Sequence, residues 1–328
     1  MTAEVPALEE MLRSFVPGAN RVRVSAVTPL AGGWSAETAR VHAACETASG
    51  IRTLDVVVRE VSADGLLAPY DLERESRILT ALQNSPVPVP AVIGCDPVGQ
   101  LLGGPCLVTE FVHGEPLSFF GQSTAADDAR LPAYYAMLAT IHALDWTELG
   151  LDFLDESEGA VETEIRRSEI RLEYLGGAGP AEQDMLTWLR SNMPPATRKS
   201  LLHGDPNPAN YLFTGSQVVA VVDWELALIG DPRLDLGFFA AIQATFGGTW
   251  GLDTTCFLQG YAAANPDLSL QHLDYFEAVA LYRLAAFLRA AERRQGTDVT
   301  ALWRRLSQTF ERIASGKNAR DPVQEPPA

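Results

Sequence analysis

The sequence contains little lysine, no paired cysteines and no long apolar run, and each shortage excludes a class of protein. Basic residues number 25 against 42 acidic ones, which sets the formal net charge at −17, and the only lysines are Lys199 and Lys317. A nucleic-acid backbone requires a concentrated basic surface, so we expect no nucleic-acid partner. No apolar run reaches the roughly 18 residues that a membrane-spanning helix needs, so we expect no membrane partner either.

Cysteine usage and the first residues exclude two further features. The four cysteines are scattered and form no C-x-x-C pair, which argues against a structural zinc site or a disulfide framework; they are Cys45, Cys95, Cys106 and Cys256. The segment 1–5 lacks the cationic and then apolar order of a secretory signal. We therefore expect a cytoplasmic protein.

A polar loop followed by a short hairpin is the most informative part of the chain. The loop reads His203-Gly204-Asp205-Pro206-Asn207-Pro208-Ala209-Asn210. The apolar run 218–222 predicts a buried strand, and 211–213 predicts its antiparallel partner across a turn at Gly215-Ser216. Pairing Phe213 with Val218 would bring Asn210 and Asp223 to the same open end of this hairpin.

Three side chains of this region suit phosphoryl transfer. An amide oxygen from Asn210 and a carboxylate from Asp223 form a hard-oxygen site, suited to Mg²⁺ that takes further ligands from the phosphates of a nucleotide. Asp205 lies on a loop stiffened by two prolines, where it can accept a hydrogen bond from a hydroxyl and direct that oxygen at a γ-phosphate. The pattern predicts a kinase.

Three motifs together resemble the aminoglycoside phosphotransferase family: H-G-D-x-x-x-x-N, then D-W-E at 223–225, then G-D-P-x-x-D-L at 230–236. The resemblance implies an α+β, two-lobed protein-kinase-like fold, with ATP and Mg²⁺ as cofactors and GTP not excluded. It also implies that Asp205 is the catalytic aspartate and that Asn210 and Asp223 are the magnesium ligands. His203 and Asp235 would hold the loop in place.

A plain structural reading of the same residues stays open. His203 and Asp205 would then be ordinary loop residues that cap strand ends. Asp231 and Asp235 would cap the apolar helix predicted at 236–242 instead of contacting a ligand. The sequence does not decide whether Glu225 is structural or functional.

An arginine takes the place where a kinase usually has a lysine on the nucleotide phosphates. Arg59 ends the alternating, β-branched stretch 54–59, and its planar guanidinium can reach two phosphate oxygens. Glu75 interrupts an apolar stripe on the next helix, and a carboxylate that faces a core needs a cation. We therefore expect an Arg59–Glu75 ion pair; the alternative is an exposed Glu75 that pairs with Arg74 or Arg77.

Two further segments are expected to meet the nucleotide. Strands predicted at 22–28 and 38–44 flank a turn whose residues Gly32, Gly33 and Ser35 either form a lid over the phosphates or a plain hairpin turn. Strands at 91–95 and 106–111 complete the small lobe. In related kinases backbone groups hold adenine at this point, and the resemblance implies the carbonyl of Thr109 and the amide of Phe111.

The chain is expected to form two lobes with the site between them. Residues 1–112 predict a β-rich nucleotide-binding lobe, 113–314 a mainly helical catalytic and substrate-binding lobe, and 315–328 a disordered tail. Helices are predicted at 131–144, 161–174, 181–191, 254–264, 273–294 and 299–313. The sequence leaves the oligomeric state open.

The phosphate acceptor is expected to be a hydroxylated small molecule. An acidic run from Asp152 to Glu164 would suit a polycationic antibiotic, but such a run is usually a solvated loop before a helix. Arginines at 166, 167 and 171, or at 283, 289 and 293, would suit an anionic substrate, but most arginines are surface charges. The D-W-E and G-D-P motifs also resemble kinase domains linked to acyl-CoA dehydrogenases, which favours a metabolite hydroxyl, including that of a hydroxyacyl thioester.

Two other functions stay open beside the metabolite kinase. One is an aminoglycoside-type antibiotic kinase, and the other is a nucleotide-binding regulator without turnover, although a regulator has no need to keep Asp205 together with both metal ligands. A protein kinase is disfavoured, because H-G-D differs from H-R-D and no A-P-E segment follows Asp223. The sequence does not distinguish ATP from GTP.

Overall fold

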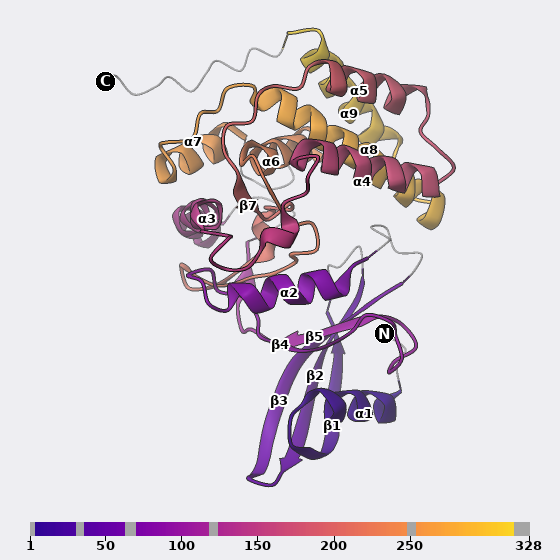
Figure 1. Ribbon diagram of the computed structural model, residues 1–328, viewed down its shortest axis with the longest axis vertical. Helices are drawn as coiled ribbons and strands as arrows, with labels where there is room; N and C mark the ends of the chain where they lie inside the picture. Colours follow the sequence, from indigo (N-terminus) through magenta and orange to yellow (C-terminus); the bar gives the residue numbers. More distant parts are fainter. Residues whose placement is uncertain (1–3, 31–35, 63–69, 118–123, 248–253, 318–328) are drawn as a thin grey trace. The chain divides into compact units, whose positions relative to one another are not determined.

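The computed structural model describes residues 4–30, 36–62, 70–117, 124–247 and 254–317. The chain divides into two compact units, Met1–His113 and Gly114–Ala328, whose elements are drawn in Figure 1. The residues expected to form a lid, Gly32, Gly33 and Ser35, lie outside the described residues. Within the described ranges, no helix has both the length and the apolar composition needed to cross a bilayer.

The described residues of the first unit form a five-stranded antiparallel sheet. Its strands are β1 (Ala19–Pro29), β2 (Ala36–Thr47), β3 (Gly50–Val61), β4 (Val92–Asp96) and β5 (Cys106–Glu110), in the order β1-β2-β3-β5-β4. Burial alternates along β2 and β3, as expected of strands with one face on a core. The predicted strands are confirmed, and most of them extend a few residues further than the sequence indicated.

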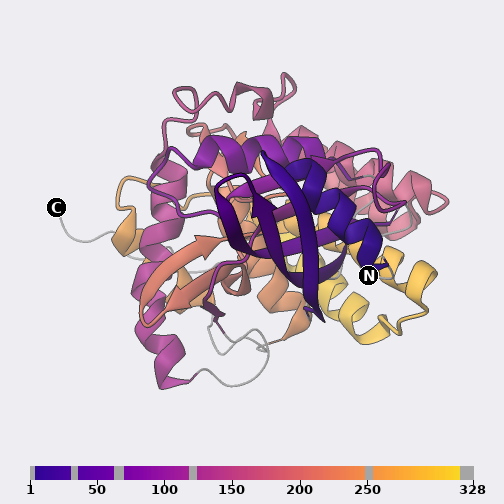
Figure 2. The ribbon, with the colours of Figure 1, turned by 90° about the horizontal axis from the view of Figure 1, so that it is seen from below.

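A helix that the sequence analysis missed, α1 (Val5–Phe15), covers part of this sheet. Leu8, Met11 and Leu12 are fully buried in one core with Val41 and Val58, and Figure 2 shows α1 lying along the strands. The spacing of these three apolar residues places them on one helical face. Because the helix is short, this stripe is a weak signal in the sequence alone.

The helix that carries Glu75 is confirmed as α2 (Leu72–Leu82). Asp71 caps its first turn by accepting a hydrogen bond from the Arg74 N–H at 2.9 Å. Leu72, Leu79 and Leu82 are buried together with Glu75, so the interrupted apolar stripe does face the core.

The second unit is mainly helical. Its helices are α3 (Ala125–Ala143), α4 (Ala160–Tyr174), α5 (Pro180–Ser191), α6 (Arg233–Phe246), α7 (Thr254–Ala264), α8 (Leu273–Gln295) and α9 (Thr300–Ala314), with short 3-10 helices η1 (Asp152–Leu154) and η2 (Pro208–Asn210). Strands β6 (Glu115–Pro116), β8 (Tyr211–Thr214) and β9 (Gln217–Val221) form one small sheet, and β7 (Ser200–Leu202) pairs with β10 (Leu228–Gly230).

Most predicted helix limits in this unit hold to within one or two residues. Two helices are longer than predicted: α6 extends beyond 236–242 at both ends, and α3 begins at Ala125 and not at 131. Thr124 and Asp127 form a capping box that starts α3 early, since each side chain bonds to the backbone N–H of the other.

Helices α6 and α8 form the centre of the second unit. Most residues of both helices are buried, including apolar residues on nearly every side of α8. A charged side chain on such a helix must find its partner inside the protein, since water cannot reach it. Two charged residues of these helices, Asp235 and Arg283, have partners in the loop 203–210, which is described below.

Candidate active site

The hairpin of β8 and β9 has the pairing that the sequence predicts. Phe213 lies opposite Val218, and the Val222 N–H donates to the carbonyl oxygen of Asn210 at 2.9 Å. Asn210 and Asp223 therefore leave the hairpin at the same end. Asp223 has a φ of 68°, a left-handed conformation that only one other described non-glycine residue adopts. A conformation of this kind is held by its surroundings and is typical of functional sites.

The loop 203–210, which includes η2, joins β7 to β8 and is fixed by its neighbours. Gly204 has a φ of 81°, and a Cβ at this position would lie 2.2 Å from the carbonyl oxygen of Leu226, so glycine is required. The Tyr134 hydroxyl of α3 donates to the carbonyl oxygen of Pro206 at 2.6 Å. The Asn207 side chain accepts from the Ala209 N–H at 2.9 Å. The loop therefore has little freedom to move its aspartate.

His203 connects two parts of this loop region from inside the protein. Its Nε2 donates to the carbonyl oxygen of Val222 at 3.0 Å, and its Nδ1 accepts from the Asp205 N–H at 3.3 Å. Both bonds fit a neutral ring with its proton on Nε2, and burial lowers the pKa of His203 in the same direction. The side chain is fully buried, so it ties the backbone at Asp205 to the backbone just before Asp223.

Asp235, in the first turn of α6, anchors the loop from below. Its two oxygens accept from the N–H groups of His203 and Gly204, both at 2.9 Å, and His142 Nε2 lies 3.0 Å from the same carboxylate. Burial raises the pKa of Asp235, but the hydrogen bonds from His142 and from the loop backbone help to outweigh burial, and the pKa lies below its usual value. A charged carboxylate thus holds the peptide groups on both sides of His203.

Asp231 belongs to the same G-D-P-x-x-D-L motif as Asp235, but it has different partners. Its carboxylate pairs with Arg233 at 2.7 Å and accepts from the Thr197 N–H at 3.0 Å. Both partners lie away from the loop 203–210. Asp231 therefore secures the segment at residue 197 and the start of α6.

Asp205, Asn210 and Asp223 make up a set of oxygen donors in which the two carboxylates repel each other. Burial raises the pKa of Asp205, and the charge of Asp223 raises it further, to about 7. The Asn210 Nδ2 donates to the carbonyl oxygen of Asp205 at 3.0 Å, which leaves Oδ1 as the amide atom able to face a cation. Two carboxylates that oppose each other's charge, with an amide oxygen, fit a hard divalent cation such as Mg²⁺. Within the described part of the chain, no three His, Cys, Asp or Glu residues form a metal site by themselves.

In the first unit, the predicted ion pair between Arg59 and Glu75 is confirmed. Arg59 Nη2 contacts Glu75 Oε2, and the two side chains are 14% and 4% exposed. The alternative of an exposed Glu75 is wrong, because this residue lies on the buried face of α2. The contact of Arg59 with phosphates stays a prediction.

The end of β5 differs in one respect from the expectation. Thr109 lies on this strand opposite Val57 of β3. The Phe111 N–H donates to the carbonyl oxygen of Asp55 at 2.9 Å, which corrects the expectation that this amide is free to hold adenine. The Arg40 guanidinium lies 3.8 Å from the centre of the Phe111 ring and pairs with Asp55 at 2.6 Å. Phe111 therefore ties the end of β5 to β3.

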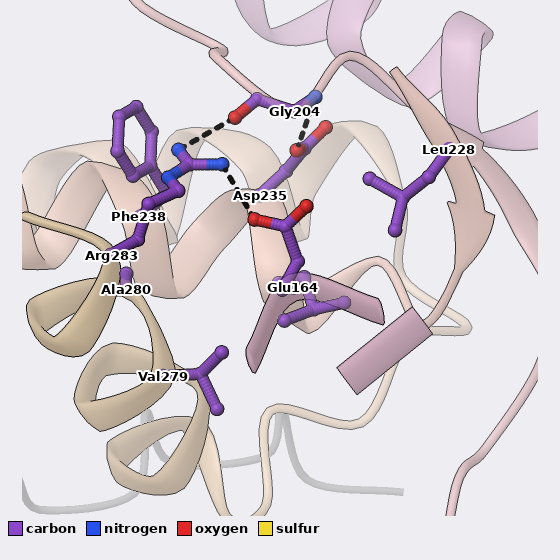
Figure 3. A pocket seen from close by; sticks show the side chains of 9 residues that line it. Glu164, Gly204, Leu228, Asp235, Phe238, Val279, Ala280 and Arg283 are labelled. Carbon is purple, nitrogen blue, oxygen red and sulfur yellow. Dashed lines mark hydrogen bonds and ion pairs between the residues drawn. The ribbon is translucent and has the colours of Figure 1, made fainter. Parts of the chain in front are cut away.

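Two buried charges beside the loop were not anticipated. Glu164, interpreted from the sequence as part of a solvated acidic run, is 4% exposed, and Arg283, interpreted as a surface charge, is 8% exposed. Arg283 donates to Glu164 Oε2 at 3.0 Å and to the carbonyl oxygen of Gly204 at 2.7 Å (Figure 3). The sequence held a signal for both: Arg283 stands in an apolar stretch of α8, and Glu164 shares a helical face with Ser168 and Leu172.

Two kinds of protein are among the curated proteins with similar sequences. Acyl-CoA dehydrogenase family member 10 of Mus musculus is 29% identical over 191 residues, which cover 56% of this chain and 18% of that protein. The chain spans at most 30% of the acyl-CoA dehydrogenase family members that it matches. A homoserine kinase of Methylocella silvestris is 27% identical over 285 residues, which cover 84% of this chain and 80% of that protein.

Solved structures share the fold. A Ralstonia eutropha protein with the provisional name aminoglycoside phosphotransferase is similar with a TM-score of 0.68 at 21% identity, over 96% of this chain and 99% of that one. A thermostable mutant of aminoglycoside phosphotransferase APH(4)-Ia, in complex with AMP-PNP and hygromycin B, is similar with a TM-score of 0.58 at 16% identity, over 90% and 95%. At such identities the likeness establishes the kinase-like fold, an antiparallel sheet unit followed by a helical unit.

The family model described as the phosphotransferase enzyme family matches residues 26–266. This range covers most of the chain and includes the loop 203–210, Asp223 and Asp235. On that match, and on the fold that carries these residues, the chain belongs to the phosphotransferase enzyme family.

Proposed function

We propose that this protein is a small-molecule kinase, which transfers the γ-phosphoryl group of ATP to a hydroxyl of a metabolite in the presence of Mg²⁺. The observation that carries this proposal is that Asp205 and Asn210 lie on a loop that Asp235 anchors by two backbone bonds, close enough to Asp223 for its charge to raise the pKa of Asp205. Positioning and charge neutralisation account for most of the catalysis of phosphoryl transfer. A rigid loop and a donor set for a divalent cation supply both.

The chemistry follows from the roles of these side chains. The acceptor oxygen forms a bond to the γ-phosphorus while the bond from that phosphorus to the β,γ-bridging oxygen breaks, and ADP leaves. Asp205 orients the acceptor hydroxyl and takes its proton; a pKa near 7 suits a base that works near neutral pH. Asn210 and Asp223 would hold Mg²⁺, which would supply positive charge to neutralise the phosphates. His203, being buried, positions Asp205 and does not touch the substrate.

The nucleotide contacts are proposed for the first unit. Arg59, held in place by Glu75, would bind phosphate oxygens with its planar guanidinium. Gly32, Gly33 and Ser35 would cover the phosphates, and the Thr109 carbonyl would accept a bond from adenine. The AMP-PNP complex of the APH(4)-Ia mutant supports an adenine nucleotide as the donor.

A metabolite is favoured over an antibiotic as the acceptor. The homoserine kinase relative, matched over most of both chains, is by name a kinase of a small metabolite. The relatives among the acyl-CoA dehydrogenase family members support a hydroxyacyl thioester as a second candidate. Glu164, part of the acidic run that would suit a polycation, is buried in ion pairs.

The decisive experiment measures ADP release and the phosphorylated product, by mass, over a panel of hydroxylated metabolites and aminoglycosides. Asp205→Ala and Asp223→Ala are expected to lose roughly 10²- to 10⁴-fold in turnover, since they remove the base and a metal ligand. Asp267→Ala is the matched control, because Asp267 is exposed in a turn before α8 and should leave turnover unchanged.

The same panel separates the alternatives. Product from aminoglycosides alone would favour the antibiotic kinase, and ATP binding without product from any acceptor would favour a regulator. If Asp205→Ala and Asp223→Ala turn over substrate like the parent, the proposed mechanism is wrong.

A further inference from the structure

Behind the loop 203–210 lies a cluster of five charged residues, here called the arginine cluster: Arg167, Arg171, Arg283, Glu164 and Glu225. Glu164 and Arg283 line a small hollow beside Gly204, and both point into it in Figure 3. The hollow has room for about one water, at ≈ 10 Å³. A ligand therefore cannot enter between Glu164 and Arg283, and would have to meet the cluster from another side.

Two of the three arginines have a carboxylate partner inside the protein. Arg283 pairs with Glu164 at 3.0 Å, bonds to the Gly204 carbonyl and lies 3.7 Å from the centre of the Phe238 ring. Arg167 pairs with the other oxygen of Glu164 at 3.0 Å. Glu164 is therefore shared by two guanidinium groups, one on each of its carboxylate oxygens.

Arg171 is the third arginine, and it differs from its neighbours. It lies one turn after Arg167 on α4, is only partly exposed, and makes no hydrogen bond or ion pair with any described residue. Burial lowers the pKa of the Arg171 guanidinium, and the charges of Arg283 and Arg167 lower it further. The carboxylates of Glu164 and Glu225 act in the opposite direction and raise this pKa. The other arginines of this helix are paired, Arg166 with Glu158 and Arg167 with Glu164.

The arginine cluster thus contains three cations and two anions. A half-buried guanidinium without a partner destabilises the protein unless something compensates its charge. Its planar fork of donors matches the geometry of a carboxylate or a phosphate. We propose that Arg171 binds an oxyanion on the acceptor molecule, so that the substrates of this kinase are hydroxylated anions and not polycations.

The position of the arginine cluster connects this subsite to the chemistry. Arg283 bonds to the backbone of Gly204, the residue before Asp205, and Glu225 follows Asp223 by two residues. An oxyanion held at Arg171 would therefore lie beside the two segments that carry the proposed base and metal ligand. This inference rests on the proposed kinase function, and the experiments below separate the two.

The first test needs no turnover. The melting temperature of the parent, of Arg171→Gln and of the control Arg166→Gln is measured in sodium sulfate and in sodium chloride at equal ionic strength. We expect Arg171→Gln to melt at or above the parent in chloride, since it removes an unpaired charge, and to lose the extra stabilisation that sulfate gives the parent and the control. A lower melting temperature in chloride, or an undiminished sulfate effect, would overturn the proposal.

The second test measures kcat and KM with the acceptors that support turnover. Three probes are used: a hydroxyacyl-coenzyme A, which carries phosphates, L-homoserine, which carries a carboxylate, and hygromycin B, which is a polycation. For an anionic acceptor, Arg171→Gln should raise KM by roughly 10- to 100-fold with little change in kcat, and Arg171→Lys should recover part of the loss. The probe affected shows which oxyanion binds. If KM is unchanged in Arg171→Gln while turnover still depends on Asp205, the proposed subsite is wrong and the kinase mechanism stands. If turnover does not depend on Asp205, the kinase mechanism itself is wrong.

Discussion

Asp205 is a residue in surroundings that oppose its own charge. Burial and the neighbouring Asp223 hold its pKa at about 7, against an ordinary value of 3.8. At the same scale, Asp223 adopts a left-handed backbone conformation, and Gly204 leaves no space for a side chain. Strain and repulsion of this kind reduce the stability of the fold but hold the side chains in the geometry that the reaction needs. This compromise is common at functional sites.

This repulsion predicts a pH-dependent gain of stability on replacing Asp205. The folded-state pKa lies above the unfolded one, so the contribution of this one carboxyl group to the stability of the metal-free protein is greatest below about pH 4 and is lost as the pH rises through about 7. Asp205→Asn keeps the shape without the charge and should increase the free energy of unfolding by roughly 1–3 kcal/mol near pH 8. Near pH 4 the two proteins should be equal, as measured by urea unfolding with a chelator present.

The outcome that contradicts this prediction is a difference independent of pH, or a variant less stable than the parent near pH 8. Asp267→Ala is again a suitable control, since an exposed carboxylate should shift stability little at either pH.

At the scale of elements, side chains between a strand and a helix decide how the first unit is held together. Arg59 of β3 and Glu75 of α2 form an ion pair that is largely shielded from water, in a stripe of apolar residues. Burying two charges gains little by itself, but removing one partner leaves the other uncompensated. The pair therefore fixes the register of α2 on β3 more than it adds to stability.

Glu75→Ala should lower the free energy of unfolding by about 3 kcal/mol, because it removes the buried carboxylate that pairs with the Arg59 guanidinium while that charge stays largely buried. The exposed Glu73 on the same helix provides the control, and Glu73→Ala should change stability by less than about 0.5 kcal/mol. Chemical unfolding followed by circular dichroism measures both.

A double variant makes this prediction sharper. Arg59→Met combined with Glu75→Leu replaces the pair by apolar side chains, and it should recover most of the stability lost in Glu75→Ala while it weakens ATP binding. If the double variant is as unstable as Glu75→Ala, the loss came from packing of the glutamate stem and not from the buried Arg59 charge.

At the scale of the whole molecule, charge is the dominant feature. The 42 acidic residues exceed the 25 basic ones, and the formal net charge is −17. Such an excess keeps a protein soluble but makes the folded chain repel itself, most of all at low ionic strength. Buried pairs such as Arg283 with Glu164 are screened little by salt, so the effect belongs to the surface.

Raising sodium chloride from about 0.01 to 0.15 M at neutral pH should therefore increase the melting temperature by a few degrees, because the Debye length falls from about 30 to 8 Å. Differential scanning calorimetry provides the measurement. A melting temperature that falls over this range would mean that surface ion pairs such as Arg190 with Glu162 outweigh the general repulsion.

The sequence by itself determined the local parts of the structure and of the site. The hairpin register at Phe213 and Val218, the helix that carries Glu75 and the partner of Arg59 followed from patterns within a few tens of residues. Period and turn chemistry express such short-range preferences directly. The family resemblance likewise rested on three motifs between 203 and 236.

Only the tertiary structure decided which distant residues support the loop. Asp235 reaches back to the backbone of His203 and Gly204, and Arg283 and Glu164 meet across 119 residues of chain. No local pattern encodes these contacts, because a buried charge is fixed by the partner that packing brings to it. The same reason explains why Arg171 was indistinguishable from a surface arginine until its neighbours, and its lack of a partner among the described residues, were known.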